Sequence, residues 1–401
     1  MLLLLPKVQD YLRQHQDTDL SRFILSGGPF ENISIQDLAQ QLEGRQKTRD
    51  KLPSWYGTSG IYFPPKINVE QTSGESAAAY KAALVTGRSL ADLTGGLGVD
   101  SYYFSKTISE VTYCEINASL AKIAAHNFQE LDAKNIKVHT ENGIDFLKNT
   151  SVNYDYIFLD PSRRTKEKAK VFLLKDCEPN VPAHLEFLLA KADKIMVKTS
   201  PLLDIYAALE ELRAVCEIHI VAVKNEVKEL LFVLKNGVLP SEIRLFTTNI
   251  TSFETEKTTT NYQEALQAEV TYNEPLDYLY EPNAALMKSG LFNWVGNFYK
   301  LYKLHINTQL YTSEKYVDFP GRCFKINSKI PYSKKNVSSL FKGTKANITT
   351  RNFKETVTQL RKKFKISDGG ERYLFFTTCA DGSQWVLDCS KENERKNEKT
   401  A

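Results

Sequence analysis

A glycine-rich segment, residues 89–100, combines residue types that can bind a small charged ligand. An apolar run there leads into three glycines and then a predicted helix. Glycines let the backbone approach a ligand closely, and the first amides of a helix favour a negative group. Asp92 would repel a pyrophosphate but attract the ammonium of a bound amino acid. Ser101 stands where the dinucleotide-binding pattern has its last glycine, three residues after Gly98. A tight turn without any ligand is the alternative.

An acidic residue follows the next apolar run along the chain. Glu115 lies 17 residues after Gly98, which is enough for one helix and one strand. A carboxylate at the end of such a strand can bind both hydroxyls of a ribose. The alternative is a surface glutamate. A ligand with an ammonium and a ribose is S-adenosylmethionine, which we expect to be the cofactor. The cofactor-binding residues expected in the first two segments are Asp92, Thr94, Gly95, Gly96, Gly98 and Glu115.

A third segment, Asn142 to Asp145, follows the next predicted strand. The Asp145 carboxylate could accept a hydrogen bond from the amino group of an adenine, with Gly143 beside it. Aspartate is also a frequent helix N-cap residue, so Asp145 could instead cap the helix that follows. The sequence leaves both possibilities open.

A fourth segment places charge after a strongly apolar run. Asp160 and Pro161 follow residues 156–159, and Ser162, Arg163 and Arg164 come next. In parallel sheets, ligands bind at the carboxyl ends of strands. The arginines could hold a phosphate or stack on a base, or could form a surface salt bridge.

The elements that must position these residues alternate between strand and helix. We expect strands at 89–94, 110–115, 136–139, 154–160 and 194–198 and helices at 76–84 and 118–131. This alternation predicts an α/β domain with a mostly parallel sheet. Two further strands, 217–223 and 229–235, are joined too tightly for a crossover helix and should form an antiparallel hairpin. Thr72 or Ser73 could cap the first helix of this domain, since Thr72 and Glu75 fit a capping box, and the same segment could form a lid over the methionine end of the cofactor.

The regions before and after this α/β domain are expected to form other arrangements of helices and strands. Residues 1–50 are expected to form helices, residues 282–304 a helical stretch, and residues 320–390 a strand, helix, strand and strand with the helix at 353–364. The domains we expect are a helical region and connecting loop at 1–74, a catalytic domain at 75–240, a linker region at 241–319, a basic α+β domain at 320–390 and a charged tail at 391–401.

Composition limits the possible functions. Residues 1–290 carry a net charge of −7 and residues 291–401 a net charge of +11. A basic terminal region favours nucleic-acid binding, although a solvated basic surface would have the same composition. The six cysteines and six histidines have no metal-ligand spacing, so we expect no metal and a reducing cytoplasmic location. No apolar run has the roughly 20 residues that a membrane helix needs, so no membrane partner is expected.

Together these motifs resemble the class I S-adenosylmethionine-dependent methyltransferases over residues 75–235. Residues 92–98 look like their first motif, Glu115 like their ribose ligand, and Asp160-Pro161 like the Asp/Asn-Pro-Pro motif of their nucleic-acid branch. A terminal hairpin in the sheet is also typical of this fold. The resemblance implies an α/β fold with a Rossmann-like seven-stranded methyltransferase sheet, an N-terminal helical region and an α+β C-terminal domain.

A narrower resemblance covers nearly the whole chain. The segments 52–55, 70–75, 347–353 and 368–370 are similar to a bacterial methyltransferase family with a ferredoxin-like insert and a THUMP-like C-terminal domain. THUMP domains belong to RNA-modifying enzymes, so the resemblance implies RNA as partner. It also places the ferredoxin-like insert in the linker region and the THUMP-like domain at 320–390. Arg351 and Lys354 lie in the latter and are expected to bind substrate, together with Arg164 and Lys198.

Two departures from the nucleic-acid pattern bear on mechanism. Ser162 and Arg163 replace the aromatic residue that stacks on a target base, and Asp-Pro-x-Arg is closer to the uridine C5-methyltransferases. Those enzymes need a cysteine after the next strand, where this chain has Lys198-Thr199-Ser200. We therefore expect direct in-line transfer to a nitrogen or oxygen, with a nitrogen of an RNA base favoured.

The catalytic residues we expect are Asp160, Pro161 and Arg163. Asp160 would accept a hydrogen bond from the target amine, Pro161 would shape the pocket, and Arg163 would contact the substrate. Two other functions remain open: a methyltransferase of the same fold for a small molecule or protein, and an RNA-binding module with a vestigial catalytic domain. The sequence does not determine the oligomeric state.

Overall fold

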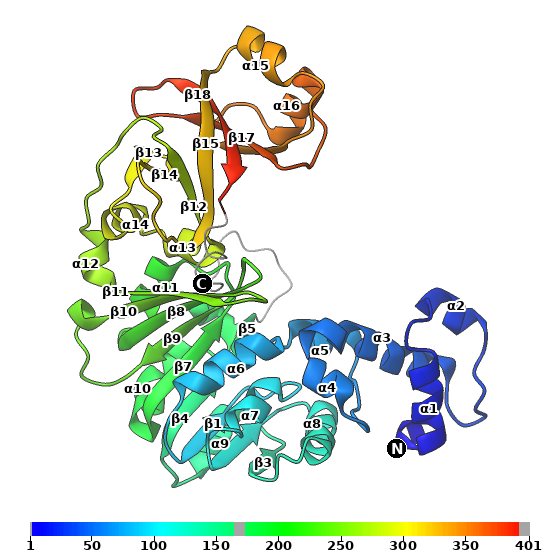
Figure 1. Cartoon of the computed structure of the whole chain (residues 1–401). Helices are drawn as coiled ribbons and strands as arrows, with labels where there is room; N and C mark the ends of the chain where they lie inside the picture. The colour runs from blue at the N-terminus through cyan, green and yellow to red at the C-terminus, as the bar shows by residue number, and fades with distance from the viewer. Residues whose placement is uncertain (1, 164–172, 393–401) are drawn as a thin grey trace, which may run out of the picture. The chain divides into compact units, whose positions relative to one another are not determined.

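The computed structural model describes residues 2–163 and 173–392 (Figure 1). The chain forms two compact units. Unit 1 comprises residues 1–217 and 228–238, and unit 2 comprises residues 218–227 and 239–401. Each unit is described by itself. The predicted five-part domain division stays a prediction, and most of its charged tail lies outside the described residues.

Unit 1 begins with helices, the first four of which share a small apolar core. Leu12, Phe23, Leu38 and Leu42 are among its buried residues. The Asp19 carboxylate accepts a hydrogen bond from the Arg22 backbone N–H at 3.0 Å, so it caps α2. These elements are η1 (Leu2–Leu4), α1 (Pro6–Gln14), α2 (Leu20–Leu25), α3 (Ile35–Lys51), α4 (Pro53–Gly57) and α5 (Lys66–Gln71).

The segment after α3 is anchored to the elements of the sheet domain. The Trp55 ring is fully buried and lies 5.9 Å from the Tyr102 ring. Glu75, at the start of α6, accepts hydrogen bonds from the Ser54 backbone N–H (2.9 Å) and hydroxyl (2.5 Å). The predicted capping box at Thr72 is therefore wrong, since the N-cap of α6 is Gly74 and Glu75 holds α4 instead.

The sheet domain alternates strands and helices as the sequence predicts. Its elements are α6 (Glu75–Leu84), β1 (Ser89–Asp92), α7 (Val99–Phe104), β2 (Glu110–Cys114), α8 (Ala118–Glu130), β3 (Ile136–His139), α9 (Gly143–Asn149), β4 (Tyr154–Leu159), β5 (Ser162–Arg163), η2 (Leu174–Asp176), β6 (Cys177–Glu178), α10 (Val181–Lys191), β7 (Ala192–Thr199), α11 (Ile205–Glu211), β8 (Val215–Val223) and β9 (Glu226–Leu234). The pairs β1–β2, β2–β3, β1–β4 and β4–β7 are parallel, and β9 pairs antiparallel with β7. The α/β class is confirmed.

The strand order of the sheet is β3-β2-β1-β4-β7-β9-β8-β10-β11. The first seven of these strands are the predicted ones, and β10 (Arg244–Ile250) and β11 (Thr255–Asn261) extend the sheet to nine. The predicted count of seven is thus exceeded. The turn between β8 and β9 is short because Lys224 and Asn225 both have positive φ, at 52° and 61°, which is typical of a two-residue hairpin.

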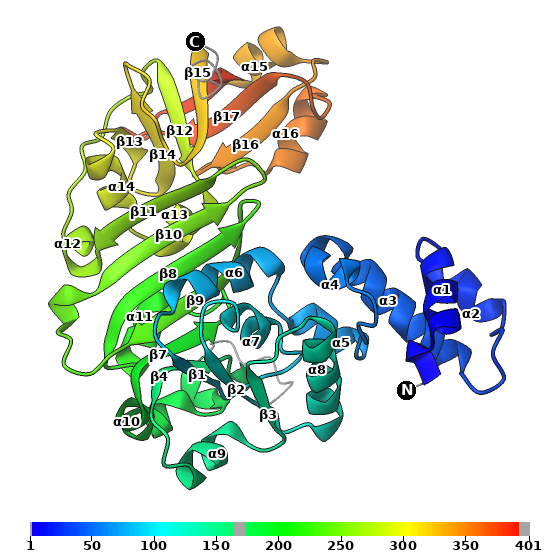
Figure 2. The same cartoon turned by 60° about the horizontal axis from the view of Figure 1, so that its bottom comes forward.

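Helices cover both faces of the parallel strands (Figure 2). The helices α6, α7 and α8 lie on one face, and α9 and α10 lie on the other. The central strands are buried on both faces, which explains why their sequences are continuous apolar runs. The carboxyl ends of β1, β2, β3, β4 and β7 therefore meet at one edge, where the chemistry-bearing segments lie.

Unit 2 contains a second sheet with the order β13-β14-β12-β15-β18-β17-β16. Its elements are η3 (Pro240–Glu242), the strands β10 and β11, α12 (Tyr262–Leu266), β12 (Tyr278–Pro282), α13 (Ala284–Ser289), α14 (Phe292–Phe298), β13 (Tyr302–His305), β14 (Thr308–Ser313), β15 (Gly321–Pro331), α15 (Lys334–Phe341), β16 (Asn347–Arg351), α16 (Val357–Phe364), β17 (Arg372–Thr378) and β18 (Gln384–Lys391). Phe341 of α15 and Leu360 and Phe364 of α16 belong to one apolar core with β17 and β18. A face of this sheet is thus covered by α15 and α16.

Two expectations for unit 2 are wrong. The helical stretch at 282–304 is two short helices, because Gly290 ends α13 with a left-handed backbone (φ 72°) and residues 302–305 pair as β13. The expected order within 320–390 omits α15 and β16, and α16 begins at Val357 rather than Phe353. No helix in the described part of the chain is long and apolar enough to cross a membrane.

Candidate active site

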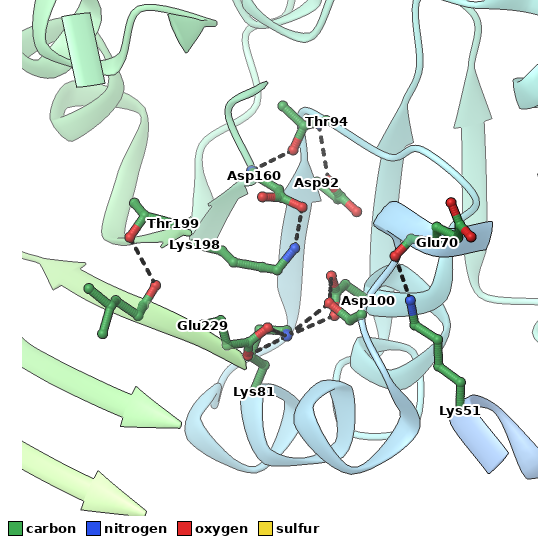
Figure 3. A network of polar contacts seen from close by, with 12 residues as sticks. Lys51, Glu70, Lys81, Asp92, Thr94, Asp100, Asp160, Lys198, Thr199 and Glu229 are labelled. Atoms are coloured by element: carbon green, nitrogen blue, oxygen red, sulfur yellow. Dashed lines mark hydrogen bonds and ion pairs between the residues drawn. The ribbon is translucent and has the colours of Figure 1, made fainter. Parts of the chain in front are cut away.

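The glycine-rich turn joins β1 to α7, and hydrogen bonds fix it to two strand ends (Figure 3). Asp92 is 1% exposed and accepts hydrogen bonds from the Thr94 backbone N–H (3.0 Å) and the Ser101 hydroxyl (2.6 Å). The Thr94 hydroxyl oxygen accepts the backbone N–H of Asp160 at 2.7 Å. The turn after β1 and the end of β4 are therefore held together through Thr94.

Asp92 has an unusual electrostatic environment for a carboxylate. Burial raises its pKa to about 7, although the hydrogen bonds from Ser101 and Thr94 act in the opposite direction. The nearby Asp100 and Asp160 raise it further. Because both carboxylate oxygens are bonded inside the protein, Asp92 shapes the turn here, and its contact with a ligand ammonium stays a prediction.

Close packing explains two of the glycines in this turn. A Cβ atom on Gly95 would lie 2.1 Å from the ring of Tyr113, so no larger residue fits without movement. Gly98 has a φ of 86°, in the left-handed region, and its Cβ would lie 2.4 Å from the Phe128 ring. Both positions therefore require glycine for the turn to lie against β2 and α8.

Glu115 lies directly after β2 and holds the same turn from the other side. One carboxylate oxygen accepts the Gly96 N–H (2.8 Å) and the other accepts the Asn117 N–H (2.7 Å). Glu115 is half-buried, and each oxygen keeps a second acceptor position. The structure thus brings Glu115 beside the glycine turn, as its proposed role requires.

The third segment is a helix start in which asparagine is the cap. The Asn142 side chain accepts the N–H groups of Ile144 (2.9 Å) and Asp145 (3.2 Å), so the idea that Asp145 caps α9 is wrong. Asp145 is exposed and paired with Lys148 at 2.9 Å. Gly143 is buried, and its Cβ would lie 2.4 Å from the Leu93 carbonyl oxygen. This close approach places α9 against the first segment and leaves Asp145 available to a ligand.

Asp160 follows β4 and is ion-paired with a lysine that the sequence placed only in a substrate-binding role. The Lys198 ammonium donates to the Asp160 carboxylate, and the two side chains are 11% and 36% exposed. Burial alone would lower the pKa of Lys198, but the carboxylates of Asp160, Asp100 and Glu229 outweigh burial and raise it. Lys198 is therefore a stable cation beside the expected reaction site.

A second buried lysine extends this charged cluster. Lys81 of α6 is 0% exposed and donates to both carboxylate oxygens of Glu229, at 2.6 and 2.7 Å, and to the Ser73 hydroxyl at 3.2 Å. It also pairs with Asp100 at 3.2 Å. We call Lys81, Glu229, Asp100, Lys198 and Asp160 the charged network. Figure 3 shows Lys198 pointing toward Asp160, with Lys81 between Glu229 and Asp100.

The residues after Asp160 are described only in part. Pro161 is buried, and Ser162 and Arg163 form β5, which pairs with Cys177 and Glu178 of β6. The structure describes the backbone but not the side chain of Arg163, and Arg164 lies outside the described residues. Their proposed substrate contacts stay predictions.

A comparison with solved structures identifies the family of this chain. A crystal structure from Porphyromonas gingivalis, described as a "putative methyltransferase", is 33% identical, covers 96% of this chain and 97% of its own chain, and has a TM-score of 0.87. The chain belongs to this methyltransferase family. A family model of a ferredoxin-like domain matches residues 278–320, and one described as THUMP domain-like matches residues 321–391.

Other structures match only part of this methyltransferase. M. capricolum TrmK, solved with S-adenosyl-homocysteine, is 13% identical over 44% of this chain and 70% of its own, with a TM-score of 0.32. An rRNA methylase from Streptococcus thermophilus is 12% identical over 40% of this chain and 94% of its own, with a TM-score of 0.30. No curated protein matches the chain.

In unit 2 of the methyltransferase, the two expected substrate-binding residues differ in their surroundings. Arg351, at the end of β16, donates to the buried Glu281 carboxylate at 2.5 Å, and Arg322 donates to the same carboxylate. The guanidinium of Arg351 is thus held in place while its side chain stays 40% exposed. Lys354 is exposed and lies before α16. A substrate-binding role for Arg351 and Lys354 stays a prediction.

Sequence reasoning missed three residues of this methyltransferase site. Local patterns predict only that Lys81 lies in a helix and Glu229 in a strand. A charged residue within an apolar segment does, however, indicate a buried partner of opposite charge. Ile116 follows Glu115 and is 71% exposed, so it presents an apolar side chain beside the expected ribose ligand. Among residues 2–163 and 173–392, no group of three or more His, Cys, Asp or Glu side chains could hold a metal ion.

Proposed function

We propose that this methyltransferase uses S-adenosylmethionine and transfers the methyl group directly to RNA. The observation that carries the proposal is the convergence of Glu115, the glycine-rich turn and Asp160 at one sheet edge, where Gly96 bonds to Glu115 and Thr94 bonds to Asp160. The rival hypothesis of a vestigial domain does not account for a buried charged network kept at that edge.

The residues present fit the proposed cofactor. Space is open above Gly96, where a Cβ would have only the Thr94 carbonyl oxygen within 4 Å, at 3.8 Å. Glu115 keeps acceptor positions for ribose hydroxyls, and the exposed Ile116 offers an apolar surface for an adenine. Asp145 is exposed at the start of α9, where it can accept an adenine amino group. When bound, S-adenosylmethionine supplies an electrophilic methyl group on a sulfonium.

The chain's own residues position the acceptor. Asp160 has its backbone held by Thr94 and one carboxylate oxygen held by Lys198, which leaves the other oxygen for a substrate hydrogen bond. Such fixed groups act mainly by orientation and electrostatics. A nucleophilic cysteine is not expected, because Thr199 and Ser200 follow Lys198. The proposal covers transfer to a nitrogen or an oxygen, and the preference for a base nitrogen stays a sequence-based prediction.

RNA is proposed as substrate because of the basic side chains on the helical layer of unit 2. The exposed lysines on or beside α15 and α16 are Lys334, Lys335, Lys342, Lys345, Lys354, Lys362, Lys363 and Lys365. We call them the basic helical face. Their ammonium groups suit phosphates, whose contacts give affinity that falls steeply with salt. A substrate without phosphates would not need this face.

Calorimetry on the full-length protein tests the cofactor. We expect S-adenosylmethionine to bind with micromolar-range affinity, on the order of −7 to −8 kcal/mol. A protein that binds NAD but not S-adenosylmethionine would overturn the proposal.

Charge reversal tests the RNA part of the proposal. Lys362→Glu with Lys365→Glu should weaken RNA binding and lower the salt slope by roughly 1 for each phosphate that the protein no longer neutralises. The matched control, Lys235→Glu with Lys257→Glu, changes the net charge equally at exposed positions outside the basic helical face. An equal decrease in affinity in both variants would show that only net charge matters and would refute the assigned face.

A further inference from the structure

The charged network has one open end. Lys81 and Glu229 are 0% and 2% exposed, Lys198 is 11% exposed, and Asp160 reaches 36%. Three of these side chains come from α6, β9 and β7, Asp160 directly follows β4, and the charges alternate in sign between neighbours (Figure 3). A substrate at the carboxyl edge would therefore meet Asp160 and, beside it, the Lys198 ammonium.

A fixed cation at this position discriminates between acceptor atoms. A base nitrogen gains positive charge as it attacks a methyl group, so a neighbouring ammonium opposes the reaction. A hydroxyl oxygen loses its proton and carries negative charge during attack, so the same ammonium stabilises the transition state. The sign of Lys198 thus favours oxygen over nitrogen.

The residues that directly follow Asp160 also differ from those that hold a base acceptor. Enzymes that act on a base hold it by stacking on aromatic or apolar side chains. Here Ser162 and Arg163 follow Pro161, and both are committed to the β5–β6 pair through their backbone. Up to Arg163, where this described stretch of the chain ends, no aromatic residue follows Asp160.

We propose that the acceptor is a ribose 2′-hydroxyl of RNA and that Asp160 and Lys198 act on it as a pair. The free oxygen of the Asp160 carboxylate takes the hydroxyl proton. The oxygen's electron pair forms the new bond to the methyl carbon, the carbon–sulfur bond breaks, and its electrons remain on sulfur. The products are a methyl ether, a thioether and a protonated Asp160, so charge and atoms balance.

The other members of the network act as positioning residues. Asp100 and Glu229 stabilise the charged form of Lys198, and Lys81 holds Glu229 through two hydrogen bonds. Lys81 and Glu229 are too deeply buried to contact a substrate. Their role is to keep the Lys198 ammonium charged and directed toward Asp160.

This inference rests on the proposed function, and the product in cellular RNA separates the two. RNA from cells with and without the gene is digested to nucleosides and also treated with alkali. A 2′-O-methyl group removes the hydroxyl that cleaves the adjacent linkage, so an alkali-stable dinucleotide should appear only with the gene. A gene-dependent base-methylated nucleoside would overturn the inference but keep the proposed function. RNA without any gene-dependent methylation would overturn both.

Variants of the purified protein test the residue roles. Lys198→Met should lower single-turnover transfer by roughly 10²-fold or more and leave S-adenosylhomocysteine affinity by calorimetry nearly unchanged. Lys198→Arg should restore part of the rate, because it keeps the cation. The control is Lys194→Met, at the other end of β7. Full activity in Lys198→Met, or an absence of S-adenosylhomocysteine binding without a change in melting temperature, would refute the assigned role.

Discussion

Replacing Lys81 with methionine should destabilise unit 1 strongly, because it leaves a buried carboxylate without its cation. Methionine has a similar length, so little volume is lost. The change removes two hydrogen bonds to Glu229 and the ion pair with Asp100. Glu229 is only 2% exposed, and breaking a buried pair from one side costs about 3–5 kcal/mol. A surface ion pair such as Arg88–Glu110 would contribute much less to the free energy of unfolding.

The assay is urea unfolding followed by tryptophan fluorescence. The chain has three tryptophans, and Trp55 is the one in unit 1, where it is fully buried. In a Trp294→Phe, Trp385→Phe background, the signal reports on unit 1 alone. We expect Lys81→Met to lower the free energy of unfolding by about 3–5 kcal/mol at neutral pH.

A double replacement provides the decisive comparison. Lys81→Met with Glu229→Leu removes both charges, and an apolar pair of similar volume is often neutral or stabilising. The double variant should therefore recover most of the stability that Lys81→Met loses. If the single variant costs less than about 1 kcal/mol, or if the double variant is as unstable as the single one, the charges are not coupled and the network argument fails.

Three further predictions concern the sheet edge where we expect the cofactor to bind. Glu115→Ala should weaken S-adenosylmethionine binding by about 1–3 kcal/mol in calorimetry, since the ribose acceptor is removed; unchanged affinity would remove Glu115 from the site. Gly143→Ala should cost about 1–3 kcal/mol of stability because its Cβ meets the Leu93 backbone, whereas Gly57→Ala has open space and should be tolerated. Burial raises the pKa of Asp92 from its unfolded-state value of 3.8 to about 7. The folded state therefore binds this proton more tightly, which contributes stability below about pH 4. That contribution is lost as the pH rises to about 7. Asp92→Asn should flatten this dependence in urea unfolding, and an unchanged pH profile would contradict the burial argument.

Local patterns were sufficient to predict most of the sheet. The strand ends at Asp92, Cys114 and Leu159 agree with the apolar runs to within two residues, because strands buried on both faces have continuous apolar sequences. Because these strands are parallel, the polar residues that follow their carboxyl ends lie at the same edge of the sheet. This is why the sequence could place Glu115 and Asp160 near the glycine turn.

What the sequence could not supply were contacts between distant segments. Lys81 and Glu229 are 148 positions apart, and nothing local to either residue names the other. The capping box at Thr72 failed for a similar reason, since Glu75 bonds to Ser54 instead of to its own helix start. The stretch 282–304 looked helical by spacing, but Gly290 and the pairing of β13 with β14 divide it.

The path of the chain has a consequence for synthesis on the ribosome. Unit 1 is discontinuous: residues 228–238 return to it after residues 218–227, which belong to unit 2. Lys81 is translated early, but Glu229, the carboxylate that accepts two of its hydrogen bonds, becomes available only after it has left the exit tunnel. At about 5–20 residues per second, that delay lasts from several seconds to half a minute. Until then Lys81 can pair with Asp100 but not with Glu229, so we expect the charged network to be completed only when residues 228–238 join unit 1.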